Sequence, residues 1–319
     1  MWLRYGVDEN DVLVAIEDIP SGKTSLLCPY CQSGLTAKKG RIKEHHFAHT
    51  GVTCRSVASR NSREIPVLPL YDNFFIQLSG KELEQLKTLW RQHGARGYRV
   101  PKFLVPRRFV WLGLLQETEL SHNGCDYEFT QLGQIPFGEL DLMLFNSVQE
   151  PLVLEKLYAL EEKAERALTS KSLFLHERLT DLRLYRAQIK RILSNTLYFL
   201  EIQVEGETLH KIGVTRRPIE ERAKEVQRDL IAHFKAVAIK VIATWSHRGN
   251  VEKYFKHRYQ DFNHPIGCLT EYYKFNDAEN ALAALRDLRQ MKPKVLRQAE
   301  MNILDGLPSP IEATIQSSR

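Results

Sequence analysis

The pattern of apolar and polar positions predicts a mainly helical middle of the chain. Ser79 and Glu82 stand in capping-box spacing before an apolar run, which predicts a helix that ends at Gly94. Across residues 154–193 the apolar side chains recur at helical spacing with charges on the opposite face, and a break is expected at 169–171. We therefore expect a helical connector that leads into a last domain.

Two further regions show strand patterns. The segment GELDLMLF, residues 138–145, predicts a strand. After Thr196 the pattern predicts an antiparallel sheet of about three strands flanked by helices. Its expected strands are 197–204, 208–214, 236–245 and the short 271–275, with a turn at Gly206 and helices at 218–230, 251–262 and 278–291.

The elements together predict an α+β protein with several domains, because 319 residues exceed the usual length of one domain. We expect a basic zinc-stabilised module at 1–66, a mixed and mainly helical region at 67–195, the last domain at 196–291, and a tail at 292–319.

Composition narrows the class of protein. With 43% hydrophobic and 26% charged residues the chain is typical of a globular protein with real cores. No apolar run approaches the roughly 20 residues that span a bilayer. The first residues, MWLRYGVDEN, lack the features of a signal peptide, so we expect a cytoplasmic protein without membrane contact.

The net charge of +6 is localised. Residues 21–66 hold eight Lys or Arg against two acids, an excess equal to that of the whole chain, 45 against 39. A small basic module on a neutral body favours nucleic-acid phosphate as partner. The candidate contacts are Lys38, Lys39, Arg41, Lys43 and Arg55.

The same module carries a metal-binding pattern. Cys28 and Cys31 form a Cys-x2-Cys knuckle, followed after fourteen residues by His46-x2-His49 and after four more by Cys54. Such a knuckle turns two thiolates toward one ion, and a second pair completes the tetrahedron that Zn²⁺ prefers. Four of the five residues are expected to bind. His46 and His49 would share a helical face, but His49 and Cys54 also have the spacing of a second pair.

The motifs CPYC, KKG and HFAH in this module resemble the N-terminal zinc-binding region of the competence-type CoiA nuclease family, over about residues 20–60. The resemblance implies a structural zinc site near DNA. The family's restriction-type core would need an Asp on one strand and Glu-x-Lys on the next. Asp141 and Glu161-x-Lys163 match these residue types, but Glu161 and Lys163 fall in a helical pattern rather than on a strand. The restriction-type core is therefore expected to be missing or decayed.

The last domain begins with TLY, residues 196–198, followed by KIG at 211–213, Arg222 at a helix start and Glu252 at the start of a later helix. This order resembles the GIY-YIG endonuclease family over about residues 196–291. The resemblance implies hydrolysis of DNA by one Mg²⁺ or Mn²⁺ ion held by Glu252, while Arg222 grips the scissile phosphate.

Tyr198 would then be the general base or would position water, and we expect its pKa to fall below about 10. Two positions depart from the family pattern. Lys211 replaces the second motif tyrosine, and His210 beside it faces the other side of the strand, so only one can take that role; alignment favours Lys211. Glu271 stands roughly where the family has its final Asn.

The sequence thus predicts a metal-dependent DNA endonuclease, with RNA left open as a substrate. Because fold does not imply activity, a second hypothesis is a non-catalytic nucleic-acid-binding protein on a degenerate nuclease scaffold. A third is a zinc-organised protein-interaction module. Substrate specificity, pathway and oligomeric state do not follow from the sequence.

Overall fold

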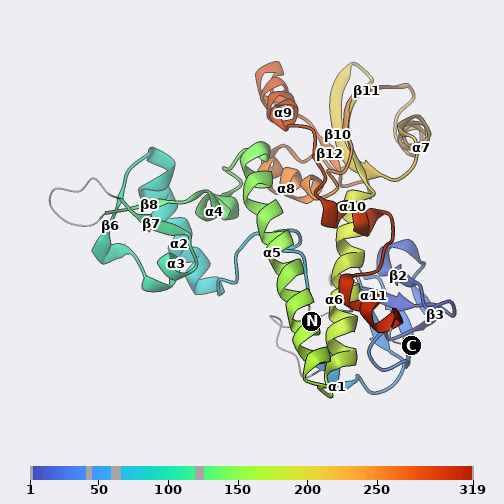
Figure 1. Ribbon diagram of the computed structural model, residues 1–319. Coiled ribbons are helices and arrows are strands. Elements are labelled where there is room, and N and C mark those ends of the chain that lie inside the picture. Colours follow the sequence, from blue (N-terminus) through green and yellow to red (C-terminus); the bar gives the residue numbers. More distant parts are fainter. Residues whose placement is uncertain (1–2, 41–44, 59–65, 119–125, 318–319) are drawn as a thin grey trace. The chain divides into compact units, whose positions relative to one another are not determined.

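The computed structural model describes residues 3–40, 45–58, 66–118 and 126–317 of the chain (Figure 1). The predicted mixture of helices and small antiparallel sheets is confirmed. The chain forms two compact units, each assembled from segments far apart in sequence. Unit 1 is Met1–Leu68, Val153–Arg191 and Leu296–Arg319; unit 2 is Pro69–Leu152 and Ile192–Val295.

Unit 1 is built on a five-stranded antiparallel sheet near the N-terminus. In the order in which the strands lie, these are β2 (Leu13–Ala15), β1 (Tyr5–Val7), β3 (Gly22–Leu27), β4 (Gly34–Lys38) and β5 (His46–His49). Leu35 and Phe47 are buried in one core with Leu184 from a distant helix. The short helices η1 (Ile16–Asp18), α1 (Arg55–Ala58), α10 (Gln298–Leu304) and α11 (Pro310–Ser317) complete the unit.

Two long helices lie side by side, α5 (Leu142–Thr169) and α6 (Leu175–Leu193) (Figure 1). The predicted break between them is confirmed. Within unit 1, the buried Tyr185 hydroxyl donates a hydrogen bond of 2.9 Å to the Val153 carbonyl. The strand predicted at 138–145 is wrong, because α5 begins inside it. Asp141 accepts a 2.7 Å bond from the amide of Leu144, so helix capping outweighs the strand-like composition there.

In unit 2, the predicted capping box is confirmed at the start of α2 (Gly80–Gln92). The same part of the chain holds a three-stranded sheet that the sequence did not predict, in the order β6 (Val100–Pro101), β8 (Asp126–Phe129), β7 (Leu115–Glu117). Strands of two to four residues are too short to show a period of two. Around this sheet lie η2 (Gly94–Arg96), η3 (Lys102–Leu104), α3 (Arg107–Trp111), α4 (Gln131–Gln134) and η4 (Ile135–Phe137).

The last sheet also belongs to unit 2 and has four strands rather than about three. Their order is β11 (Val237–Trp245), β9 (Thr196–Val204), β10 (Glu207–Thr215), β12 (Tyr272–Tyr273). The fourth strand spans two residues because pairing with β10 is confined to Tyr272 and Tyr273. The helices around the sheet are α7 (Ile219–Ile231), α8 (Val251–Arg258), η5 (Gln260–Phe262) and α9 (Ala278–Gln290).

Alternation along β9 divides the core between the two faces of this sheet. Tyr198 and Leu200 pack with Val226 of α7 on one face, whereas Leu197 and Phe199 pack with α8 and α9 on the other. Because successive side chains on β9 and β10 point to opposite faces, the position of a residue along its strand decides which face of the sheet it reaches.

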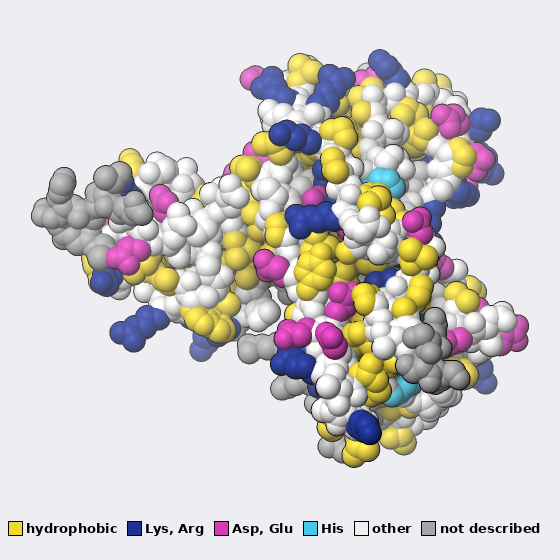
Figure 2. All heavy atoms as spheres, in the orientation of Figure 1, with side chains coloured by type: hydrophobic (Ala, Val, Ile, Leu, Met, Phe, Trp, Pro, Cys, Tyr) yellow, Lys and Arg dark blue, Asp and Glu magenta, His cyan; other side chains and the backbone are white. Residues whose placement is uncertain are grey.

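No helix among the described residues is long and apolar enough to cross a bilayer. On the face shown in Figure 2, charged side chains are interspersed with hydrophobic ones.

Candidate active site and metal centre

The pairing of β9 with β10 brings Tyr198 opposite Gly213. A Cβ at position 213 would lie 2.3 Å from the Tyr198 hydroxyl oxygen, so only glycine leaves room for the ring. Lys211 is two residues from Gly213 and shares its face. Tyr272 of β12 pairs with Lys211, whose Nζ lies 4.5 Å from the centroid of that ring. The predicted tyrosine and lysine thus lie on one face of the sheet.

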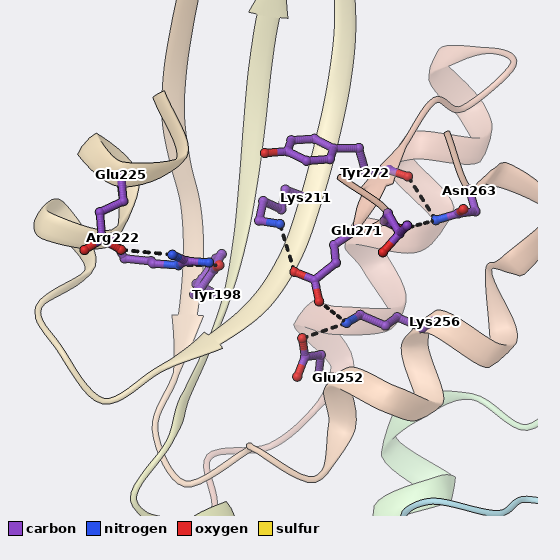
Figure 3. A network of polar contacts seen from close by, with 10 residues as sticks. Tyr198, Lys211, Arg222, Glu225, Glu252, Lys256, Asn263, Glu271 and Tyr272 are labelled. Carbon is purple, nitrogen blue, oxygen red and sulfur yellow. Dashed lines mark hydrogen bonds and ion pairs between the residues drawn. The ribbon is translucent and has the colours of Figure 1, made fainter. Parts of the chain in front are cut away.

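Arg222, the fourth residue of α7, reaches the same face. Its Nε donates a hydrogen bond of 3.2 Å to the Tyr198 hydroxyl, and its Nη1 lies 2.9 Å from Oε2 of Glu225 (Figure 3). The guanidinium therefore links the tyrosine to a carboxylate one helical turn further along α7.

The remaining side chains form what we call the lysine–glutamate network: Lys211, Glu252, Lys256 and Glu271. Lys211 Nζ lies 3.0 Å from Oε2 of Glu271. Lys256 Nζ lies 2.6 Å from the other oxygen of Glu271 and 2.9 Å from Oε1 of Glu252 (Figure 3). Two carboxylates predicted from separate positions are thus joined through one ammonium group.

Burial and charge set the ionisation of these groups. Burial raises the pKa of Tyr198 above its ordinary value, and the charge and hydrogen bond of Arg222 only partly oppose this. Burial therefore opposes the fall in the Tyr198 pKa that a general-base role would require. Burial lowers the pKa of Lys211 despite the opposing pull of Glu271. Burial would raise the pKa of Glu271, but Lys211 and Lys256 bring it to about 2.

His210 lies on the opposite face from Lys211. Its ring stacks on Phe199 with centroids 5.3 Å apart and meets Phe275 edge-on. The histidine belongs to the aromatic side of the sheet, away from Tyr198 and Arg222.

Two members of the site were missed from sequence. They are Lys256 and Glu225. The available signal was spacing: Lys256 follows Glu252 by four residues and Glu225 follows Arg222 by three, the separations at which helical side chains meet. Such pairs are common on helix surfaces, so spacing alone did not distinguish these two.

In unit 1, Cys28, Cys31, His49 and Cys54 place one donor atom each within 4.8 Å of one another, and we call them the Cys3His cluster. Such a set could bind zinc. His46 is not part of it. The expected helical face is wrong, because His46 and His49 lie on strand β5, where residues three apart face opposite sides. His49 Nε2 lies 3.5 Å from Cys31 Sγ.

Burial raises the pKa of the Cys28 thiol to about 12, and it also raises that of Cys54. Three cysteine thiols and one imidazole are ligands that Zn²⁺ prefers, and the positive charge of the ion favours the thiolate form. The residues present therefore fit a tetrahedral zinc site.

The predicted phosphate contacts are only partly within the described residues. Lys38 is exposed at the end of β4, and Lys39 donates a 3.2 Å bond to the Glu17 carbonyl. Arg41 and Lys43 lie outside the described residues, as does the side chain of Arg55.

Asp141, Glu161 and Lys163 have the residue types of a restriction-type core but not its secondary structure. Asp141 caps α5, while Glu161 and Lys163 lie within that helix, and Glu161 pairs with Arg186 at 3.8 Å. The prediction that Glu161 and Lys163 fall in a helix is confirmed.

Comparison with known families identifies two similar domains. The model of the N-terminal domain of competence protein CoiA matches residues 15–56, and the model of the T5orf172 domain matches residues 195–291. No curated protein and no solved structure matches the chain. The T5orf172 domain is a nuclease-like type related to GIY-YIG. The chain is thus similar near its N-terminus to a CoiA domain and in its last sheet to a nuclease-like domain, both associated with nucleic acid.

Proposed function

We propose that the protein is a metal-dependent endonuclease that hydrolyses phosphodiester bonds in DNA, with its last domain acting in the manner of GIY-YIG nucleases. One observation carries the proposal. Tyr198, Lys211, Arg222 and Glu271 come from four different elements or loops and converge at one sheet face, where the half-buried Lys256 also binds Glu252. Catalysis is recognised by such constellations, and each residue by itself would be ordinary.

Each group has a chemical role in this proposal. Arg222 binds the scissile phosphate, for which its fork of donors is suited. Glu252 would hold one Mg²⁺ or Mn²⁺ ion, which would neutralise charge on the phosphate. Lys256 donates to Oε1 of Glu252 and so positions this carboxylate.

Proton handling falls to Lys211 rather than Tyr198. Lys211 is buried on the correct face, and its lowered pKa makes a neutral amine more accessible. The Tyr198 hydroxyl, held by Arg222, orients the attacking water or the phosphate through hydrogen bonds. Glu271 keeps Lys211 in place through the 3.0 Å ion pair.

The Cys3His cluster has a structural role in the proposal, with Zn²⁺ holding the small N-terminal sheet. The unit that contains it would add phosphate contacts, which give affinity with little sequence information. The chain would act in the cytoplasm.

A second candidate is a nucleic-acid-binding protein that uses the nuclease fold without cleavage. The observation that favours it is Lys256, whose ammonium group already forms ion pairs with both Glu252 and Glu271. If the ammonium keeps this place, no divalent ion is needed there.

Cleavage of supercoiled plasmid and of branched DNA with Mg²⁺ or Mn²⁺ separates the two candidates. Nicking that requires the metal and is lost in Glu252→Gln and Arg222→Ala supports the nuclease. Binding without cleavage, unchanged in Glu252→Gln, supports the scaffold and contradicts the nuclease for those substrates.

A further inference from the structure

One stretch of unit 2 has a composition that neither the proposed active site nor the Cys3His cluster uses. Residues 91–116 contain six Lys or Arg and no Asp or Glu. They are interleaved with aromatic residues and run from the end of α2 through η2, η3 and α3. Basic residues interleaved with aromatic ones are typical of surfaces that bind single-stranded nucleic acid.

Three of the four Phe, Tyr and Trp rings in this stretch face solvent. Tyr98 is 63% exposed, Phe103 86% and Trp111 77%. They are surplus to the local core, which is formed by the buried residues Leu86, Leu89, Val100, Phe109, Leu114 and Leu115. Three large rings exposed between residues 98 and 111 mark this stretch as a candidate interaction site.

The basic side chains beside the rings are also exposed. Among the described residues, Arg96, Lys102 and Arg107 form no ion pair, whereas Arg108 is held by Glu82 at 2.6 Å. Arg107 and Trp111 are four residues apart on α3 and therefore project from one face of that helix. Lys102 and Phe103 are neighbours on η3.

The backbone that carries these side chains is restrained. Pro101 and Pro106 flank η3 and fix two φ angles, and the Gly97 turn closes with a bond from its amide to the Gly94 carbonyl. In Figure 2, Lys and Arg side chains lie beside hydrophobic ones along the lower edge of the lobe that carries β6 and α3. A stiff support lowers the entropy lost when a ligand binds.

We propose that Arg96, Tyr98, Lys102, Phe103, Arg107 and Trp111 form a binding surface for single-stranded DNA, which we call the basic aromatic surface. The cations contact phosphates, while Phe103 and Trp111 stack on unpaired bases. Duplex DNA offers phosphates but keeps its bases stacked on one another, so it would engage only the charged half of the surface. The proposal rests on the proposed function only in taking DNA as the ligand of the chain.

Binding of a labelled oligothymidylate of about 16 nucleotides, measured by fluorescence anisotropy, tests the proposal. The full-length Glu252→Gln protein is used without divalent metal so that cleavage does not interfere. In that background Phe103→Ala/Trp111→Ala should weaken single-strand binding roughly 10-fold or more and leave binding of the matching duplex within about twofold. Trp111→Phe should retain most of the single-strand affinity.

Lys102→Ala/Arg107→Ala should weaken both ligands and reduce the steepness with which affinity falls as salt rises. The matched controls lie outside the surface. Phe174→Ala removes an aromatic ring that is 60% exposed, and Arg286→Ala/Arg289→Ala removes two exposed cations of α9; both should bind like the parent.

The proposal is overturned if the parent does not bind the oligonucleotide, or if Phe103→Ala/Trp111→Ala binds it as tightly as Phe174→Ala does. Circular dichroism on each variant excludes loss of fold, which is not expected because both rings lie outside the core. If the wild-type protein does not cleave plasmid DNA but Phe103→Ala/Trp111→Ala still weakens single-strand binding, the nuclease proposal is contradicted and the basic aromatic surface is retained.

Discussion

The Cys3His cluster and the lysine–glutamate network are both polar clusters on small antiparallel sheets, but they balance charge differently. The Cys3His cluster consists of three thiols and an imidazole whose donor atoms lie within 4.8 Å of one another. In the lysine–glutamate network each carboxylate contacts an ammonium group within 3.0 Å. The first set consists of metal-binding donors, while in the second each carboxylate is paired with an ammonium group of the chain.

This difference predicts different dependence on metal. Because soft thiolates need a cation to be held together, folding of the Cys3His region should depend on Zn²⁺. Folding of the last domain should not depend on Mg²⁺, because Lys211 and Lys256 already stabilise its carboxylates. Metal should thus be structural at one site and needed only for activity at the other.

The largest expected effect is the loss of zinc. Cys31→Ser should abolish one equivalent of bound zinc and destabilise unit 1 by several kcal/mol, because metal binding is coupled to folding in such small sites. Zinc content by mass spectrometry and thermal unfolding by circular dichroism measure this. Cys268→Ser, at an exposed cysteine outside the cluster, is the control and should keep both. Full zinc occupancy in Cys31→Ser would contradict the assignment.

Substitutions in the proposed active site should instead lower activity. Arg222→Ala and Glu252→Gln should each lower the rate of DNA cleavage about 100-fold or more, since they remove phosphate and metal binding. Neither should change zinc content. The control is Arg286→Ala, on the exposed face of α9, which should cleave like wild type. Unfolding of Arg222→Ala or Glu252→Gln would show instead that the substituted residue has a structural role.

A smaller effect is expected where the strands of the last sheet meet most closely. Gly213→Ala should destabilise unit 2 by about 1–3 kcal/mol, because the new methyl group would meet the Tyr198 hydroxyl and force the ring aside. Urea unfolding measures the change. Gly51→Ala, where no atom lies within 4 Å of the added carbon, should have little effect. Equal stability of the two variants would mean that Tyr198 is free to move.

The smallest effect is a pH dependence at Glu271. Its pKa lies near 2 in the folded chain and at an ordinary value of 4.5 when unfolded, so its contribution is complete above about pH 4.5 and is lost as pH falls toward 2. Because this side chain is 38% exposed, solvent screening limits the effect to about 1 kcal/mol or less. Glu271→Gln should therefore be less stable than wild type at pH 7, with the gap closing in acid. A gap that is independent of pH would contradict the ion pairing.

The errors of prediction arose where local patterns were ambiguous. His46 and His49 have a spacing that a helix would turn to one side, but the segment pairs with β4 and separates them. Residues 138–145 have a strand-like composition, yet Asp141 starts a helix inside them. The net charge outside the N-terminal module does not reveal the positive charge of residues 91–116, because acidic residues elsewhere in that part of the chain balance it. A windowed count would have found it.

Local sequence patterns were sufficient to predict the elements of the last domain, the knuckle of Cys28 and Cys31, and the placement of Lys211 and His210 on opposite faces of a strand. These depend on periods of two and 3.6 residues and on short spacings, which are local properties of the chain. Features that depend on contacts between residues far apart in sequence follow only from the tertiary structure. The fold brings His49 rather than His46 to the cysteines, places Lys256 between Glu252 and Glu271, and raises the pKa of Tyr198. Strand pairing, ion pairing and burial each depend on the neighbours that the fold supplies.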